Sequence, residues 1–446
     1  MTTDHAAPPA LRSSTGARSA GLRYGALFGP SVFGVTAAGV ALPDVATALH
    51  ATPSAAAWVL TAHALALGVG TALFGRLADS RSIRSALLLG SLVLATGTIV
   101  CLTAPNIGAL VAGRFILATG SGAMTSGALA LSASSAPEER SKILSGFGAT
   151  IAVFSAGATL AGGVFTHWLT WRLTLVLPAL SLLAVPLCLR AAARPGSGRP
   201  LDLTGAAMLT LTAMSFLLLI QTYALGLPVA AVIGLAVTLT LSIGGLIWRV
   251  RSSENSFVPR SLLSDRVFRR AAVTGIGVYA GLFAAMYAVP QILVREHHWT
   301  VLAVGAGLLP GAVVGAVLSR TAGRLTGGYG ASRLLSGIAA AMVVALVTSA
   351  ATTNAASLVI AASLGFAAFA VTQVITTALM SARIDPARRG GALGLLNLTF
   401  FVGGGVGSAI AGALVKSMNL TEILGIVAAF PLVAALAALT LGKLNR

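Results

Sequence analysis

Residues 74–85 read FGRLADSRSIRS, and they place four charged side chains in a chain that is only 9% charged. The sequence on both sides is almost continuously apolar, and 56% of all residues are hydrophobic. Soluble domains carry about 25% charged residues, so this composition excludes an ordinary soluble fold. Apolar runs of about 18–25 residues recur from residue 25 onward, and each can cross the hydrocarbon core as a helix. The charged stretch is therefore predicted to be a short loop between two membrane-spanning helices.

The predicted fold class is an all-α polytopic membrane protein. Its 51 glycines suit this class, because small residues let membrane helices pack closely. We predict fourteen spans, near residues 25–47, 55–75, 84–104, 107–133, 142–165, 169–190, 203–225, 227–248, 270–293, 299–319, 333–351, 356–382, 390–415 and 421–442.

The formal net charge of +18 follows from where the basic residues lie. With the N-terminus placed in the cytoplasm, 25 of the 29 lysines and arginines fall on the cytoplasmic side and three on the outer side. The remaining one, Arg114, is within a span. By the positive-inside rule this asymmetry predicts that both termini are cytoplasmic. It also explains the basicity without a nucleic-acid partner.

The chain contains an internal repeat. The segment GRLADSRSIRS starts at Gly75, and GRLTGGYGASR starts at Gly323, 248 residues later. A second pair, PEERSK from Pro137 and PARRGG from Pro386, has nearly the same offset. Duplicated helical halves around a central site are a common plan of membrane transporters. The predicted divisions are a disordered tail (1–24), a first six-helix bundle (25–190), a linker (191–202), an inserted two-helix hairpin (203–248), a basic loop (249–269) and a second six-helix bundle (270–442).

The opening motif resembles the loop signature of the major facilitator superfamily, and the six, two and six layout resembles its fourteen-span drug:proton antiporter family. The nearest likeness is to the fourteen-span tetracycline and multidrug exporters. It extends over WVLTAHALALGVGTALFGRLAD in the second span, GRFILATGSGAM in the fourth, LPGAVVG in the tenth and GLLNLTFFVGGGVGSAIAGALV in the thirteenth. The resemblance implies two six-helix bundles that alternate in access to the two sides of the membrane.

The resemblance also implies a gating motif made of Gly75, Arg76, Asp79, Arg81 and Arg84. A carboxylate at the membrane interface can accept hydrogen bonds from arginines and from the N-terminal amides of a neighbouring helix. Such a contact would join the two bundles and break when that side opens. The alternative is that the arginines serve only to set the topology, which would not require Asp79.

The carboxylates that the related exporters use for proton coupling are absent. Gly34 stands where those exporters carry an acid in the first span, and Gly404 stands where the tetracycline type has Glu in the thirteenth. The fifth span, FSAGATLAGG, has lost both the acid and the proline of the antiporter signature. All eleven acidic residues fall in tails, loops or the last turns of spans. These losses weaken the inference of proton coupling and argue against a cationic substrate.

Several other residues within the spans are candidates for function. Arg114 is either a site for a substrate anion or a charge that sets nearby proton affinity, or else a structural residue bonded to the carbonyls of a broken helix. His63 is either a proton carrier or an ordinary hydrogen-bonding residue. The further candidates for a substrate cavity are Gln291, Gln373, Asn397, Trp58, Tyr279 and Tyr287. The glycines expected in helix packing are Gly120, Gly157, Gly162 and Gly163.

We therefore expect a multi-pass transporter of the cell membrane, not an enzyme, that exports amphipathic small molecules by alternating access. Its partners would be such a substrate, the lipid bilayer and, as a candidate coupling ion, the proton; we expect a monomer with no metal and no cofactor. Two alternatives stay open. One is an uncoupled facilitator or importer of a neutral or anionic solute, and the other is a non-transporting receptor or assembly protein on the same scaffold.

Overall fold

The computed structural model describes residues 9–51, 53–222, 226–253, 256–325, 329–385, 388–415 and 417–441, and within them the regular structure is helical. In this part of the chain, 14 helical segments are long and apolar enough to cross a membrane. They correspond to the fourteen predicted spans, so the all-α polytopic fold class is confirmed.

Six spans make up the first half of the molecule, here called the N-half. Its elements are α1 (Pro9–Phe28), η1 (Gly29–Gly34), α2 (Thr36–Ala48), α3 (Pro53–Ser80), α4 (Ile83–Thr103), α5 (Ile107–Ala133), α6 (Pro137–Trp168), α7 (Trp171–Val176), η2 (Leu177–Ala184) and α8 (Val185–Cys188).

Two further helices, α9 (Leu203–Ile220) and α11 (Val229–Ser252), form the inserted pair, and the short helix α12 (Arg260–Ser264) follows them. The second half, here called the C-half, contains α13 (Arg266–Arg295), α14 (Val301–Gly307), α15 (Leu309–Leu325), α16 (Tyr329–Thr352), α17 (Ala355–Arg383), α18 (Arg389–Leu414), α19 (Leu420–Val427) and α20 (Ala429–Leu441).

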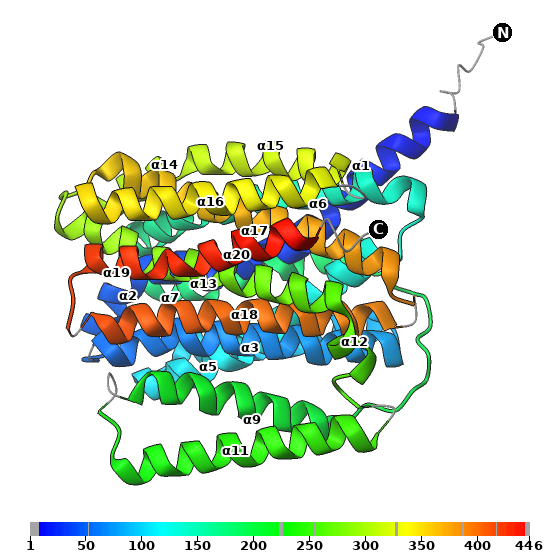
Figure 1. The fold of residues 1–446 in the computed structure, drawn as a ribbon, viewed down its shortest axis with the longest axis horizontal. Coiled ribbons are helices and arrows are strands. Elements are labelled where there is room, and N and C mark those ends of the chain that lie inside the picture. Colours follow the sequence, from blue (N-terminus) through cyan, green and yellow to red (C-terminus); the bar gives the residue numbers. More distant parts are fainter. Residues whose placement is uncertain are drawn as a thin grey trace.

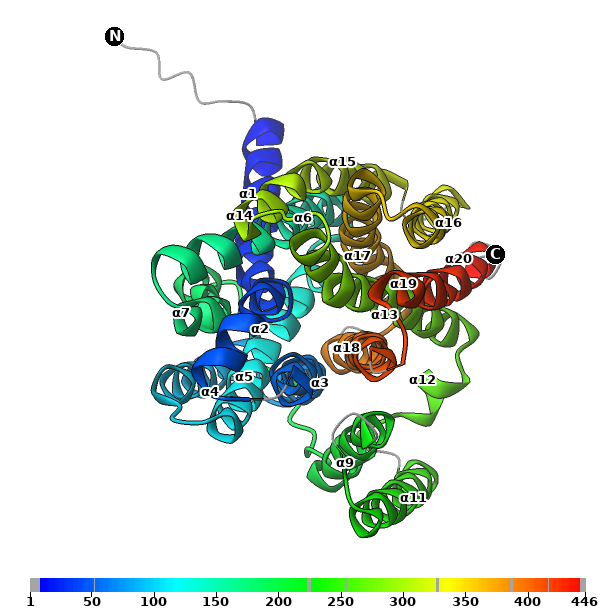
Figure 2. The same ribbon diagram turned by 90° about the vertical axis from the view of Figure 1, so that its left-hand side faces the viewer.

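The long helices run roughly parallel to one another (Figure 1). A view along them shows the N-half and the C-half side by side, with α9 outside both, next to α3 and α18, and α11 beyond α9 (Figure 2). Helix α3 ends at Ser80, α9 begins at Leu203 and α18 begins at Arg389 at one end of the molecule, which we call the arginine-rich end. Helix α1 begins and α20 ends at this same end (Figure 1).

Polar side chains at the starts of several helices explain where those helices begin. The Ser82 hydroxyl caps α4 by accepting the Ser85 amide, and the Asn106 side chain caps α5 in the same way. Asp202 caps α9 through the Gly205 amide. These residues satisfy N–H groups that have no partner within the first helical turn.

One expectation about the N-half needs correction. The tail predicted to be disordered over residues 1–24 is helical from Pro9, and a Cβ at Gly21 would lie 2.5 Å from the Ile143 carbonyl oxygen, so α1 packs closely on α6. Residues 1–8 lie outside the described residues. The first and sixth spans are also interrupted by the 3₁₀ segments η1 and η2, each of which has a proline in its first turn.

Candidate functional site

The charged motif joins the two halves at the arginine-rich end. Asp79, in the last turn of α3, accepts hydrogen bonds from the backbone amides of Gly390 and Gly391, at 2.9 and 2.6 Å. Those amides belong to the first turn of α18, where free N–H groups and the helix dipole favour a negative charge. We call this pair of bonds the gate contact. The donors are amides of a helix from the other half, one of the two kinds of donor predicted for Asp79, and the gating role itself stays a prediction.

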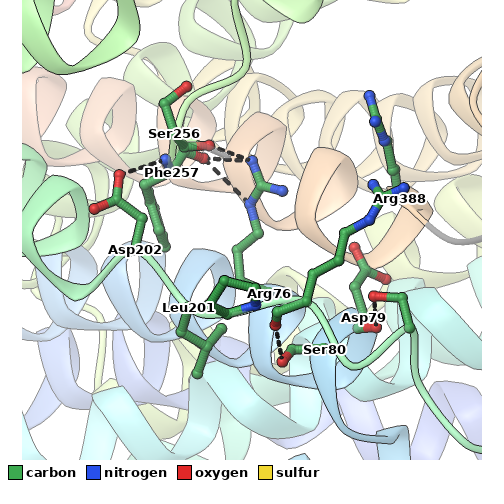
Figure 3. A pocket seen from close by; sticks show the side chains of 11 residues that line it. Arg76, Asp79, Ser80, Leu201, Asp202, Ser256, Phe257 and Arg388 are labelled. Carbon is green, nitrogen blue, oxygen red and sulfur yellow. Dashed lines mark hydrogen bonds between the residues drawn. The ribbon is translucent and has the colours of Figure 1, made fainter. Parts of the chain in front are cut away.

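The arginines of the motif are placed differently from the expectation. The Arg76 guanidinium donates to the Phe257 and Ser256 carbonyl oxygens, at 2.6 and 3.3 Å, and not to Asp79 (Figure 3). Arg81 and Arg84 are exposed. Since the amides of α18 already satisfy Asp79, the arginines are free to bind elsewhere.

The repeated sequences meet again on the other side of the same end. Ser141, in the first turns of α6, donates its hydroxyl to the Gly323 carbonyl at 2.8 Å. Gly323 begins the second copy of the motif, and Ser141 follows Pro137 as Gly390 follows Pro386. Each copy of the motif thus contacts the first turns of a helix in the other half, but only the first copy does so through a carboxylate.

Arg140 and Arg389 occupy matching positions in the second repeated pair. Both guanidinium groups donate to the Ala133 carbonyl at the end of α5, at 3.4 and 3.2 Å. Arg389 also donates to the Ile384 carbonyl at the end of α17, at 2.9 Å. These bonds tie the ends of two equivalent helices together, so the arginine-rich end is closed by contacts from both halves.

Arg114 is the largest fully buried side chain among the described residues. Its guanidinium donates to three backbone carbonyls, those of Gly34, Leu175 and Val59. Gly34 ends η1 and Leu175 lies just before η2, so the side chain supplies donors beside both interruptions in the spans. Of the two roles that the sequence left open, this geometry favours the structural one in the present conformation.

His63 is fully buried on α3, beside the backbone of Ser31 in η1. A Cβ placed on Gly34 would overlap the imidazole ring. The ring therefore occupies the space that a side chain at position 34 would fill. At this first-span position the family resemblance implies an acid. Here the imidazole of His63 occupies the space instead.

The other two positions that lack a carboxylate are Gly404 in the thirteenth span and Ser155 in the fifth. A Cβ at Gly404 would lie 2.5 Å from a ring carbon of Phe283. In the fifth span, Ser155 is fully buried, and its hydroxyl has no hydrogen-bond partner in the described structure. At Gly34, a titratable side chain from α3 fills the space that a side chain would occupy.

The C-half contributes a buried polar network with an aromatic surround. Gln373 Nε2 donates to the Tyr279 hydroxyl and to Asn397 Oδ1, the latter at 2.7 Å, while Gln373 Oε1 has no partner in the described structure. Asn397 in turn donates to the Leu393 carbonyl at 3.0 Å. Three of the predicted cavity residues, from α13, α17 and α18, are thus brought together. The rings around Tyr279, with centroids 4.8–6.0 Å away, are those of Phe369, Phe400, Phe401 and Phe283.

This network adjoins the boundary between the halves. A Cβ at Gly68 of α3 would lie 3.0 Å from Phe401 Cβ. Phe401 therefore packs between the Tyr279 ring and the N-half.

The remaining cavity candidates lie apart from this network. Gln291 lines a pocket with Gly39, Pro290 and Arg295, between α2 and α13, and it donates to the Tyr287 carbonyl at 2.6 Å. This pocket lies at the end of α13 that faces away from the arginine-rich end and near the start of α2. Trp58 is half-buried on α3, and its indole N–H has no partner in the described structure.

The four glycines expected in packing differ in their surroundings. A Cβ at Gly120 would overlap the backbone of Leu94 in α4, and one at Gly162 would lie 2.8 Å from the Ala37 carbonyl oxygen in α2. Gly163 is buried. By contrast, a Cβ at Gly157 would meet no described atom within 4 Å, so this glycine does not serve close packing here.

The residues that accept hydrogen bonds from Arg76, and the carboxylate that holds them in place, were not predicted from the sequence. Asp202, Ser256 and Phe257 belong to the inserted pair and the loop after it, and they line one pocket together with Arg76 and Asp79 (Figure 3). One signal was available: Asp202 is an isolated acid directly before an apolar run, a typical helix-capping position. Nothing in the sequence indicated that the loop at residues 256–257 returns to α3.

The fold and the site together define a class: a polytopic α-helical membrane protein of two six-helix halves, closed against each other at one end and polar in both interiors. The chain belongs to the Major Facilitator Superfamily, whose family model matches residues 25–286 and 271–445. It is a transporter of that family and not an enzyme.

Two relatives carry names that describe multidrug resistance or transport. Multidrug resistance protein Stp of Mycobacterium tuberculosis is 26% identical over 391 residues, which cover 85% of this chain and 72% of that protein. MFS-type transporter phomT of Diaporthe leptostromiformis is 29% identical over 315 residues, covering 66% of this chain and 51% of that protein.

Solved structures share the fold at low sequence identity. The human organic anion transporter MFSD10 (TETRAN) superposes with a TM-score of 0.65 at 16% identity, covering 97% of this chain and all 100% of that one. The proton:xylose symporter XylE, bound to 6-bromo-6-deoxy-D-glucose, gives 0.64 at 15% identity over 95% of each chain.

Proposed function

We propose that this protein exports amphipathic small molecules across the cell membrane by alternating access, with both termini in the cytoplasm. The observation that carries the proposal is the gate contact of Asp79 with Gly390 and Gly391, which joins α3 of the N-half to α18 of the C-half. The relative named for multidrug resistance supports export as the direction. The arginine-rich end would then be the cytoplasmic side, closed in this conformation.

In this proposal the gate contact must break for substrate to enter from the cytoplasm. Two charge-assisted hydrogen bonds are strong enough to favour the closed arrangement and weak enough to be lost in a transport cycle, at about 1.5–3 kcal/mol each. The Ser141–Gly323 bond and the bonds of Arg140 and Arg389 to Ala133 would open with it.

The substrate would be neutral or anionic. The described acidic residues lie at helix ends or in loops, so no carboxylate is available near the centre to pair with a cation. The aromatic rings around Tyr279 offer an apolar surface, and the unpaired Gln373 Oε1 beside them offers a hydrogen-bond acceptor. An apolar site with few polar groups is typical of pockets for small amphipathic molecules.

For proton coupling we propose His63 as the carrier. Imidazole titrates near neutral pH, and this ring stands at Gly34, in place of an acid. Arg114 already brings a positive charge to the Gly34 carbonyl, so protonation of His63 would require the two side chains to separate. The proton would thereby be coupled to a movement of η1.

The test is transport in proteoliposomes with the pH dye pyranine enclosed. Three probes of different charge are compared: chloramphenicol (neutral), fluorescein (anionic) and ethidium (cationic). We expect chloramphenicol or fluorescein to move with proton counterflow. In His63→Ala the proton counterflow should fall at least about tenfold, as expected for loss of the acid–base group. His167→Ala, which removes an exposed imidazole at the end of α6, is the matched control.

The other outcomes select the alternatives. Probe flux without proton movement in the wild type would identify an uncoupled facilitator. Binding of a probe without flux would identify a receptor or assembly protein. Transport of ethidium alone would contradict the proposed substrate charge, and unchanged coupling in His63→Ala would remove His63 from the mechanism.

A further inference from the structure

The inserted pair of helices has no equivalent in a plain two-bundle plan, and its polar contacts converge at the arginine-rich end. Asp202, which begins α9, forms an ion pair with Arg249 near the end of α11, with Nε and Oδ1 3.1 Å apart. Its other carboxylate oxygen accepts the Phe257 amide at 2.8 Å. One buried carboxylate thus holds together both helices of the pair and the loop that follows them.

The same carboxylate is well suited to stay ionised. Burial by itself raises the pKa of Asp202, but the amides of Gly205 and Phe257 and the Arg249 guanidinium outweigh it and hold that pKa below its usual range. At neutral pH the three bonds to Asp202 are therefore present. They fix the loop at residues 256–257 with its carbonyls facing α3 (Figure 3).

Those carbonyls hold the motif arginine. Arg76 donates to Phe257 through Nε and Nη2, at 3.2 and 2.6 Å, and to Ser256 through Nη2 at 3.3 Å. Its guanidinium also lies over the Phe257 ring, 5.8 Å from the centroid. Arg76 is one turn before Asp79, and a Cβ at Gly391 would lie 2.5 Å from Arg76 Cδ, so the arginine also packs against the start of α18.

The linker before α9 reinforces this arrangement. The amides of Ser197 and Gly198 donate to the Asp79 and Ser80 carbonyls, both at 2.8 Å, and the Ser80 hydroxyl donates to the Arg199 carbonyl at 2.5 Å. The linker is therefore bonded along the last turn of α3 and is not a free tether.

A separate apolar contact fixes the pair further along its length. Ala213 and Leu217 of α9 pack with Leu65 of α3 and with Val402 and Val406 of α18. Gln221, at the end of α9, donates to the Thr61 hydroxyl at 3.0 Å, so this amide bonds α9 to α3. Helix α9 thus contacts one helix of each half, beside the seam that the gate contact closes.

We propose that Asp202, Arg249, Ser256 and Phe257 form a strap by which the inserted pair positions Arg76 and holds the gate closed. This inference rests on the proposed gate role of Asp79. Asp202 is a positioning residue: it fixes the loop, the loop fixes Arg76, and Arg76 packs on the first turn of α18 next to the amides that bind Asp79. The inserted pair is then a third component of the gate, and the arginine-rich end opens when the strap releases.

The test measures opening directly and does not depend on transport. Nitroxide labels are placed at Arg84→Cys in α4 and Arg333→Cys in α16, two exposed positions in different halves, and the distance distribution is recorded by pulsed electron spin resonance in nanodiscs. Cys101 and Cys188 are buried and are replaced by serine in the labelled background. Asp202→Asn keeps the helix cap but removes the charge that holds Arg249.

We expect Asp202→Asn to raise the ratio of long-distance to short-distance molecules by about tenfold or more, in the range expected for loss of a charge-assisted bond. Asp265→Asn is the matched control, because Asp265 also caps a helix and also pairs with an arginine, Arg383, but within the C-half. Arg249→Gln breaks the same ion pair from its partly exposed side and serves if Asp202→Asn does not fold.

The outcomes distinguish the strap proposal from the proposed gate role of Asp79. If Asp79→Asn opens the molecule but Asp202→Asn and Arg249→Gln do not, the strap is overturned and the gate role of Asp79 stands. An equal effect of Asp265→Asn would also overturn the strap, because the change would then be a general consequence of losing an aspartate cap. No opening in Asp79→Asn would overturn both proposals.

Discussion

At the scale of the residue, Arg114 is the side chain for which the structure gives the sharpest expectation. Replacement by alanine would leave the carbonyls of Gly34, Leu175 and Val59 without their buried donor. An unsatisfied buried polar group costs about 1–3 kcal/mol, so we expect Arg114→Ala to destabilise the protein by about 3 kcal/mol or more. The loss of stability is measured by thermal unfolding in detergent, with the loss of the monodisperse peak as the signal.

Arg114→Lys distinguishes the structural role of the Arg114 guanidinium from the role of its positive charge. Lysine keeps the positive charge but concentrates it at one atom, which cannot reach three carbonyls as a guanidinium does. We therefore expect an unfolding temperature close to that of Arg114→Ala. If both variants keep the wild-type unfolding temperature and lose only transport, the residue acts on substrate or proton, and the structural assignment is wrong.

At the scale of the element, close packing of helices is predicted to depend on single glycines. In Gly120→Ala the new methyl group would overlap the Leu94 backbone of α4, whereas in Gly157→Ala it would meet no described atom within 4 Å. We expect Gly120→Ala to cost about 1–3 kcal/mol, as in other overpacked interiors. We expect Gly157→Ala to be neutral or stabilising by up to about 1 kcal/mol, because alanine favours the helix.

The two glycine variants are matched in chemistry, so their unfolding temperatures can be compared directly. Equal destabilisation would mean that α6 packs at Gly157 in a conformation other than this one. Equal stability would contradict the close approach of α4 and α5.

At the scale of the whole molecule, the charge asymmetry predicts the orientation in the membrane. A cysteine at Arg199, at the arginine-rich end, should react with a membrane-impermeant maleimide only after the cells are permeabilised. A cysteine at Glu296, at the opposite end and also exposed, should react in intact cells. The buried Cys101 and Cys188 are expected to give little background. The reverse pattern would invert the topology and, with it, the side that the gate closes.

Much of this architecture could be predicted from the sequence. Apolar runs of membrane length determine the spans, because a lipid-exposed backbone must satisfy its hydrogen bonds within a helix. The matching positions of Gly75 and Gly323 indicated two related halves, and Asp79 after a span indicated a carboxylate at an interface. The helix content of residues 9–24 was missed, because packing of Gly21 on α6 is not visible in a polar sequence.

The tertiary structure alone decided which groups meet. Sequence placed Arg76 next to Asp79, but the strong donors that satisfy Asp79 are amides 311 and 312 residues away, and Arg76 binds carbonyls 180 and 181 residues away. The replacement of a first-span side chain at Gly34 by the ring of His63 depends in the same way on how α3 packs against η1. Hydrophobic periodicity and local apolar content depend on residues close together in the chain. They therefore predicted where the helices lie and that the two halves resemble each other. Contacts between distant helices depend on packing in three dimensions, so the gate partners, the strap and the place of His63 became visible only in the fold.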